Sequence, residues 1–205
     1  MSTSSSPHDP IADVVEAALA GDLVVLPTDT VYGLGTRPDD PAAVAKLFRA
    51  KGRGRDLAIP VLVATRAAAE EIARFDERAR TLAGRFWPGP LSLVMPRSDR
   101  SRPWDLGEDT SRIAVRVPHH PLALAVLART GPLAVTSANL SGEPTPSTPD
   151  GLRAAFGDAV AVYLCEEHPP TGRPSTVVDL TADPMRVLRA GGLDERALRE
   201  ALTGG

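Results

Sequence analysis

The chain has 205 residues, 42% of them hydrophobic, and its 26 Asp and Glu against 23 Lys and Arg give a formal net charge of −3. This composition is that of a soluble globular domain with one sizeable core, and it excludes a nucleic-acid surface covering the whole chain. No apolar run reaches the length of a membrane span.

The start of the chain is polar and has neither a basic region nor an apolar stretch, which argues against a signal peptide. We expect residues 1–9 to form a disordered tail and residues 10–205 to form a single domain. The single cysteine, Cys165, excludes internal disulfides and a cysteine zinc site, and it fits a reducing cytoplasm. Because Cys165 ends an apolar run, a buried structural role is favoured.

Helix caps and apolar periodicity predict the secondary structure in chain order. Asp9-Pro10 and Asp40-Pro41 each place an N-cap before a proline at the first helical position. The expected helices are residues 10–20, 41–51, 66–75, 76–87 and 121–130, a short segment ending at 157, and 195–202. The expected strands are residues 23–26, 60–64, 91–95, 113–117, 133–136, 160–164, 175–180 and 186–190. Polar, irregular loops are expected over residues 97–111, 143–149 and 166–174.

Helices and strands intermix along the chain, and the sequence shows no internal repeat and no interdomain linker. This order predicts an α/β fold whose sheet is mixed in direction. Polar residues cluster at strand ends, where sheet folds usually place their ligands.

The first polar group is the P-T-D-T-V-Y-G-L-G segment after the strand at residues 23–26. Its hydroxyls and its carboxylate suit a small molecule with an amine, a carboxylate or a hydroxyl. Gly33 and Gly35 would let the backbone approach a ligand or adopt a positive φ. The alternative is a strand, a Thr/Asp turn and a glycine loop without a ligand, and local sequence leaves both open.

The second polar group is Lys51 with Arg53 and Arg55, on a glycine-rich connection from a helix to a strand. Such a cationic loop suits a polyphosphate, although a solvated basic loop is the commoner outcome for this pattern.

The remaining two groups follow or interrupt buried strands. Ser137, Asn139 and Ser141 either contact a ligand or form only an Asx or Ser turn. Arg116 interrupts an apolar strand, so its charge must be paired, either with a ligand carboxylate or with an internal Asp or Glu.

The common signatures of nucleotide, metal and serine-hydrolase sites are missing from the sequence. It contains no G-x-x-x-x-G-K-[ST], no complete dinucleotide fingerprint, no H-E-x-x-H and no G-x-S-x-G. A nucleotide would therefore be bound by an uncommon device.

Taken together and in this order, the four groups resemble one family, the YrdC-like threonylcarbamoyl-AMP synthases. The matching segments run from about Leu23 to Gly192; they are P-T-D-T-V-Y-G-L-G, K-G-R followed by P-V-L-V, F-W-P-G-P-L-S-L-V, A-V-R-V-P, S-A-N-L-S-G, S-T-V-V-D-L and V-L-R-A-G. The resemblance implies an α/β (α+β) fold, a twisted mixed β-sheet flanked by helices around a positively charged central cavity.

The resemblance also implies an activity. Such enzymes condense L-threonine, bicarbonate and ATP, with Mg²⁺, into threonylcarbamoyl-AMP and release pyrophosphate. This is the first step in forming threonylcarbamoyladenosine at position 37 of tRNA, and a separate transferase complex then acts on the tRNA. No metal site built from protein side chains is expected, because Mg²⁺ would bridge phosphates. The expected location is the cytoplasm, without membrane contact and with at most weak binding of RNA.

The family's site residues can be carried onto this chain position by position. The resemblance assigns catalysis to Lys51 and Arg53, which would neutralise phosphates. It assigns ATP binding to Lys51, Arg53, Ser137, Asn139, Thr145 and Arg189, and threonine binding to Thr30, Arg116 and Ser175. Three positions depart from the family pattern: Leu62 stands where some members have histidine, and Ala58 and Thr136 stand where proline is usual.

Two other functions fit the same fold. One is a non-enzymatic YrdC-like paralogue that binds RNA, against which the negative net charge and the 4% of aromatic residues weigh. The other is a carbamoyl-transfer domain of the kind found in hydrogenase maturation proteins, which are long chains with zinc-finger cysteines.

Overall fold

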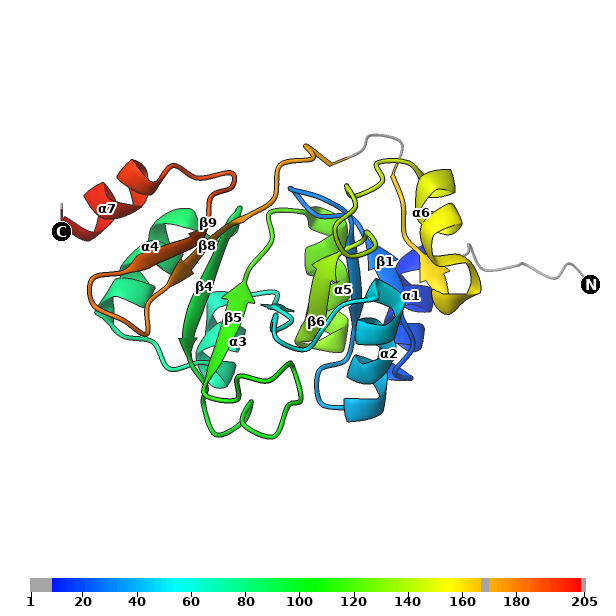
Figure 1. The fold of residues 1–205 in the computed structure, drawn as a ribbon, viewed down its shortest axis with the longest axis horizontal. Helices are drawn as coiled ribbons and strands as arrows, with labels where there is room; N and C mark the ends of the chain where they lie inside the picture. The colour runs from blue at the N-terminus through cyan, green and yellow to red at the C-terminus, as the bar shows by residue number, and fades with distance from the viewer. Residues whose placement is uncertain (1–8, 167–169, 204–205) are drawn as a thin grey trace, which may run out of the picture.

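The computed structural model describes residues 9–166 and 170–203, which form a nine-stranded sheet flanked by helices (Figure 1). The strand order is β7-β1-β2-β6-β3-β5-β4-β8-β9. The strands are β1 Val24–Leu26, β2 Gly33–Thr36, β3 Val61–Leu62, β4 Leu91–Pro96, β5 Arg112–Arg116, β6 Leu133–Ser137, β7 Val162–Tyr163, β8 Thr176–Asp179 and β9 Arg186–Arg189. Because β1 pairs antiparallel with β2 and β3 pairs parallel with β5, the predicted α/β class and mixed sheet are confirmed.

The helices begin where the sequence predicts their caps. Asp9, Asp40 and Asp76 accept backbone N–H groups of the first turn at 3.0, 2.8 and 2.8 Å. The helices are α1 Pro10–Leu19, α2 Pro41–Lys51, α3 Arg66–Ile72, α4 Glu77–Phe86, α5 Pro121–Thr130, α6 Pro149–Phe156, with the single 3-10 turn Gly157–Ala159 after it, and α7 Glu195–Thr203. Of the predicted tail over residues 1–9, all but Asp9 lies outside the described residues.

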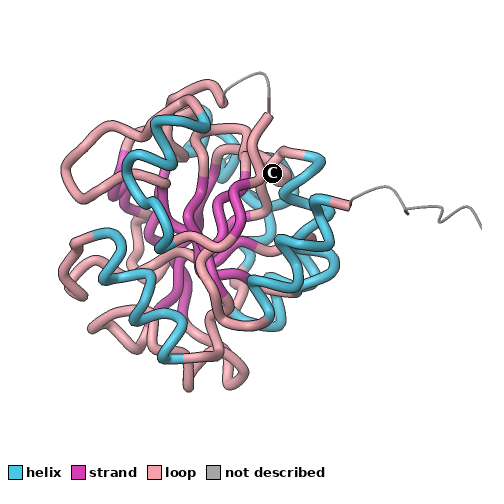
Figure 2. The backbone as a smooth tube through the Cα atoms, turned by 90° about the vertical axis from the view of Figure 1, so that its right-hand side faces the viewer, coloured by secondary structure: helices cyan, strands magenta, loops and turns pink. Residues whose placement is uncertain are grey.

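Helices cover the two faces of the sheet unequally (Figures 1 and 2). Helices α2, α3, α4, α6 and α7 contribute side chains to the larger core on one face. On the other face, α1 and α5 pack a smaller core against β1 and β6. The second face is therefore covered by helices toward the β1 end. Side chains of β4, β5 and β8 on this face are not covered by α1 and α5 and line a cavity.

Strand periodicity decides which side chains reach that uncovered part of the sheet. Leu93 of β4 and Val115 of β5 belong to the larger core. Their neighbours Ser92, Val94 and Arg116 point to the opposite face, because successive side chains of a strand alternate. One face of the same strands is thus core, and the other is available to a ligand.

The prediction of a glycine loop at Gly33 and Gly35 is wrong, because both residues lie in strand β2. Neither glycine has a positive φ. A Cβ atom on Gly33 would lie 2.6 Å from Cγ1 of Val135, and one on Gly35 would lie 2.8 Å from Cγ2 of the same residue. The glycines therefore make room for a valine of the neighbouring strand β6, a long-range contact that local turn chemistry does not reveal.

The predicted irregular loop over residues 97–111 is organised by a buried cation. Arg97 is 2% exposed, and its guanidinium donates to the carbonyl oxygens of Ser101, Trp104 and Arg112 at 3.1, 2.6 and 3.0 Å. The loop is irregular as predicted, but its first residue anchors it in the interior.

Two smaller observations complete the fold. Cys165 is half-buried against the larger core, and burial raises the pKa of its thiol. In the described part of the chain, none of the helices combines the length and the apolar character that crossing a membrane requires.

The fit between β2 and β6 predicts the effect of adding one methyl group. We expect Gly33→Ala to lower the free energy of unfolding by about 1–3 kcal/mol, because its Cβ overlaps Val135. The loss should shrink in a background that already carries Val135→Ala. Urea unfolding of the wild type, the two single variants and the double variant measures the coupling. Gly84→Ala in α4, where the nearest atom lies 4.0 Å away, is the control and should not destabilise the fold; equal losses in both Val135 backgrounds would contradict the overlap.

Candidate active site

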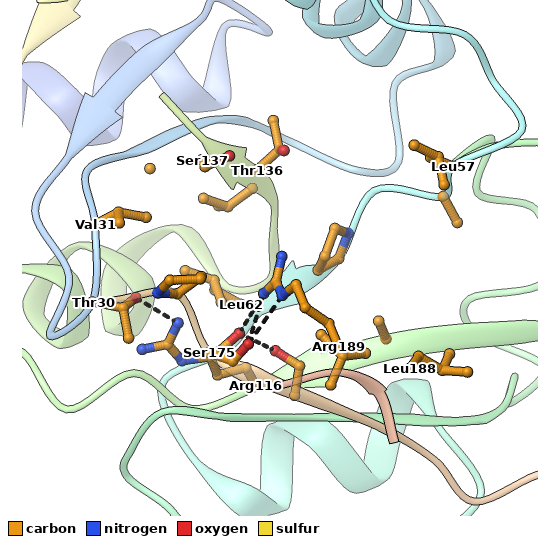
Figure 3. Close-up of a pocket in the computed structure, with 18 of the residues that line it drawn as sticks. Thr30, Val31, Leu57, Leu62, Arg116, Thr136, Ser137, Ser175, Leu188 and Arg189 are labelled. Carbon is orange, nitrogen blue, oxygen red and sulfur yellow. Dashed lines mark hydrogen bonds between the residues drawn. The ribbon is translucent and has the colours of Figure 1, made fainter. Parts of the chain in front are cut away.

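A cavity of about 710 Å³ lies over the uncovered part of the sheet (Figure 3). Its lining includes eight residues that the sequence assigned to a site: Thr30, Arg53, Arg116, Ser137, Asn139, Thr145, Ser175 and Arg189. These residues come from segments more than 150 positions apart in the chain, and the sheet brings them to one place. Lys51, the remaining assigned residue, is not part of the described lining.

Pairing of β2 with β6 sets the loop before β2 beside the turn after β6. Gly33 is the register partner of Ser137, and the backbone N–H of Ala138 donates to the carbonyl of Tyr32 at 2.8 Å. Thr30 and Ser137 therefore line the same cavity, although the sequence placed them in separate polar groups.

Arg116 is 5% exposed, and the structure identifies its partners. Its guanidinium donates to Oδ1 of Asp29 at 2.5 Å, to Oγ1 of Thr30 at 2.9 Å and to the carbonyl of Gly89 at 3.0 Å. The sequence left two partners open for Arg116, a ligand carboxylate or an internal Asp or Glu. The structure shows the internal carboxylate of Asp29, so the charge of Arg116 is paired without a ligand. A guanidinium has five N–H donors, and two of them remain for a ligand.

Three side chains extend the polar lining from Arg116 toward β9 (Figure 3). The Oγ atoms of Ser92 and Ser175 lie 3.0 Å apart, and Nη2 of Arg189 donates to Oγ of Ser175 at 2.9 Å. Sequence reasoning did not assign Ser92 to the site and treated it only as part of the strand over residues 91–95. The signal was present, because a serine between Leu91 and Leu93 alternates away from the core in a strand.

Arg53 brings a cation to the other side of the cavity. Its Nη1 donates to Oγ1 of Thr136 at 3.3 Å, and its Nη2 donates to the carbonyls of Leu57 at 2.7 Å and Ala58 at 3.3 Å. Its Nε is buried and has no hydrogen-bond partner among the described residues. Burial lowers the pKa of Arg53, but an arginine stays charged at neutral pH.

Two of the departures from the family pattern lie against Arg53. Thr136 supplies the hydroxyl that accepts from Nη1, a contact that a proline there would not make. Ala58 contributes its backbone carbonyl, which any residue would offer. Leu62, the third departure, is 5% exposed and presents an apolar side chain to the cavity.

Lys51 is 3% exposed, and its ammonium group contacts the protein rather than the cavity. Nζ donates to the carbonyl of Ser137 at 2.7 Å, to the carbonyl of Asn139 and to Oδ1 of Asn139 at 3.3 Å. Burial, with a smaller contribution from Arg53, lowers the pKa of Lys51 to about 8. Arg55, the third cation of this group, pairs with Asp105 and lies over the ring of Phe48.

The turn after β6 is tied together by the side chain of Asn139. Its Nδ2 donates to the carbonyls of Leu140 and Glu143 at 2.7 and 2.8 Å, and its Oδ1 accepts from Oγ1 of Thr145 at 3.2 Å. The hydroxyl of Ser137 lines the cavity and makes no side-chain hydrogen bond within the described residues. The turn that the sequence predicts is thus present, and it also presents a hydroxyl to the cavity.

The carboxylates of the lining do not form a metal site of their own. Asp56, Asp109 and Glu143 line the cavity, but Asp109 already accepts from Ser111 and from Nε of Arg112. Among residues 9–166 and 170–203, no group of three or more His, Cys, Asp or Glu side chains is placed to hold a metal ion. The donor set fits a divalent cation that enters on phosphate oxygens better than one held by the protein.

The buried pair of Arg116 and Asp29 predicts a stability effect. Their side chains are 7% and 15% exposed, so Asp29→Asn leaves a buried guanidinium without its carboxylate and should cost about 3 kcal/mol. The matched control is Asp39→Asn, whose exposed pair with Arg37 should contribute less than about 1 kcal/mol. Chemical unfolding of both variants makes the comparison, and equal small losses would contradict the importance of the buried pair.

The lowered pKa of Lys51 predicts a pH dependence of stability. Between pH 8 and 10.5 the unfolded chain holds more protons at this site than the folded chain, so stability rises with pH there. The unfavourable contribution is complete below pH 8 and disappears as the pH approaches 10.5. Urea unfolding measures the free energy of unfolding of the wild type and of Lys51→Met across this range. As the pH rises from 8 to 10.5, the wild type should gain stability relative to the variant. A difference that stays constant with pH would contradict the lowered pKa.

Comparison with known proteins identifies the family. Residues 16–191 match the family model of the Sua5, YciO and YrdC proteins, which carries the description telomere recombination. A putative threonylcarbamoyl-AMP synthase of Mycobacterium tuberculosis is 45% identical over 193 residues, which cover 94% of this chain and 88% of the relative.

Solved structures agree with the sequence relatives. The fold is similar to Sua5 of Pyrococcus abyssi in complex with L-threonine, with a TM-score of 0.86 and 33% identity over 97% of this chain and 59% of that chain. It is also similar to YciO of E. coli, with a TM-score of 0.83 and 27% identity over 90% of each chain. The chain belongs to the Sua5, YciO and YrdC family.

Proposed function

We propose that this protein is a threonylcarbamoyl-AMP synthase, which makes its product from L-threonine, bicarbonate and ATP and releases pyrophosphate. One observation carries the proposal. A single cavity joins a polar pocket around Arg116, Thr30 and Ser175 to a second cationic region around Arg53 and Ser137, in a chain 45% identical to a relative with that name. The first region suits an amino acid, and the second suits a nucleotide.

The reaction asks mainly for positioning and charge neutralisation. The threonine amine and bicarbonate give a carbamate and water. A carboxylate oxygen of the carbamate bonds to the α-phosphorus of ATP, and the bond from that phosphorus to the bridging oxygen breaks, which releases pyrophosphate. Two anions must meet, so fixed cations that bring them together lower the barrier.

The cations of the cavity are suited to these roles. Arg53 and Arg189 would neutralise the phosphates, since both are cavity-lining guanidiniums without a carboxylate within hydrogen-bonding distance among the described residues. Ser137 would donate its hydroxyl to the nucleotide. The two remaining N–H donors of Arg116 would hold the carboxylate of threonine, with Thr30 in contact with Arg116 and Ser175 lining the same cavity.

Magnesium would enter with ATP and supply charge neutralisation at the phosphates. The protein would hold this complex through Arg53 and Arg189 acting on phosphate oxygens, and the carboxylates of Asp56 and Glu143 at the lining would be available to it.

The product would serve tRNA modification. It would pass to a transferase complex that attaches the threonylcarbamoyl group to adenosine 37. The similarity to Sua5, whose solved complex contains L-threonine, supports the enzyme over an RNA-binding paralogue. No observation of the cavity favours the non-enzymatic alternative.

Purified protein with ATP and Mg²⁺ should release pyrophosphate only when both L-threonine and bicarbonate are present. The reaction requires both because the attacking carbamate forms from them. Arg53→Ala should lower the rate by about a hundredfold or more, because a fixed cation at the phosphates is lost. The control Arg37→Ala removes an exposed arginine that pairs with Asp39 and should leave the rate unchanged. Release that ignores either substrate, or the absence of release together with tight RNA binding, would contradict the proposal.

A further inference from the structure

The two cations of K-G-R both reach the end of β6, but they contact different partners there, the carbonyl of Ser137 for Lys51 and the hydroxyl of Thr136 for Arg53. Lys51 is the last residue of α2, and Gly52 follows it in the left-handed conformation, with φ 58°. The backbone N–H of Gly52 and of Arg53 donate back to the carbonyls of Arg49 and Phe48, which ends the helix. Lys51 therefore projects from the helix, whereas Arg53 belongs to the loop that borders the cavity.

The ammonium group of Lys51 has no donor left over. Its three N–H bonds match its three acceptors, the carbonyls of Ser137 and Asn139 and Oδ1 of Asn139. In return, the backbone N–H of Ser141 donates to the carbonyl of Lys51 at 3.0 Å. Both the side chain and the backbone of Lys51 thus hold the turn over residues 137–141, which we call the SAN turn.

Removing this ammonium would leave the carbonyl of Asn139 without the donor that it has in this structure. The carbonyl of Ser137 would keep only the backbone N–H of Asn139, and Oδ1 of Asn139 would keep only the hydroxyl of Thr145. Losing a charged donor from three partly buried acceptors is costly, so the SAN turn would rearrange to reach water or another donor. Asn139 would then lose the arrangement in which it also holds Glu143 and Thr145. The loss would reach the nucleotide region of the cavity without any contact between Lys51 and a ligand.

We propose that Lys51 is a positioning residue, which holds the SAN turn through Ser137 and Asn139, and that Arg53 is the cation of K-G-R that contacts phosphate. This assignment rests on the proposed function, since it concerns how the same cavity receives ATP. It departs from the expectation that both cations touch the phosphates.

The chain offers a direct test because it contains only two lysines, Lys46 and Lys51. Protein labelled with ¹³C at the lysine ε carbon gives two signals, and Lys46→Arg removes one and so assigns the other. The pH titration of the Lys51 signal is measured in the wild type, free and with ATP and Mg²⁺ but without threonine. Besides burial, the charge of Arg53 lowers the pKa of Lys51.

A positioning role predicts that ATP raises the titration midpoint of Lys51 by less than about one pH unit, because its three acceptors stay the same. A larger rise would place a phosphate on the ammonium and overturn the assignment. Calorimetry on the same sample reports whether ATP binds. Absence of ATP binding would overturn the proposed function and the assignment with it. Binding with a large rise of the Lys51 midpoint would overturn the assignment alone.

A double-mutant cycle tests the route through Asn139. Lys51→Met and Asn139→Ala should each weaken ATP binding, and the double variant should bind about as weakly as the worse single variant, because both changes release the same turn. A loss of affinity in the double variant that equals the product of the two single losses would overturn the positioning role. Lys46→Met, which removes an exposed lysine paired with Asp22, is the matched control and should bind ATP like the wild type. Should Lys51→Met fail to fold, the titration of the wild type still decides.

Discussion

The cavity exists because one face of the sheet is only half covered. Among the described residues, five helices pack on one face, whereas α1 and α5 alone pack on the other, toward the β1 end. Since side chains alternate along each strand, β4 and β5 complete the core with one set of side chains and form the floor of the cavity with the other. Ser92 and Arg116 are polar for this reason, while Leu93 and Val115 beside them are apolar.

The N–H groups of the cavity arginines are satisfied largely by backbone carbonyls. Arg53 and Arg189 donate to carbonyl oxygens, which satisfy N–H groups without cancelling the charge. Arg116 alone of these three is paired with a carboxylate, that of Asp29. The cavity lining holds four arginines against two aspartates and one glutamate, a formal charge of +1 in a protein whose net charge is −3. Overall composition therefore does not reveal a site that suits anions.

Sequence patterns identified most elements and most site residues. The predictions that failed concern residues whose partners lie far away along the chain. The caps at Asp40 and Asp76 depend on neighbours three residues away, and both predictions are confirmed. Gly33 was misread as part of a loop because its partner, Val135, lies on another strand. The acceptors of Lys51 are likewise far along the chain, so the residue type indicated a cation site but not where the cation would point.

The register of β2 and β6 has a consequence for how this chain can vary. Gly33 pairs with Ser137, so the loop that carries Thr30 and the SAN turn leave the sheet at the same level. Insertion or deletion of one residue within either strand would exchange its inward and outward faces and separate the two loops. Natural length variation should therefore be absent from these strands. It should accumulate in connections that pair with no strand, such as the one between the SAN turn and α6.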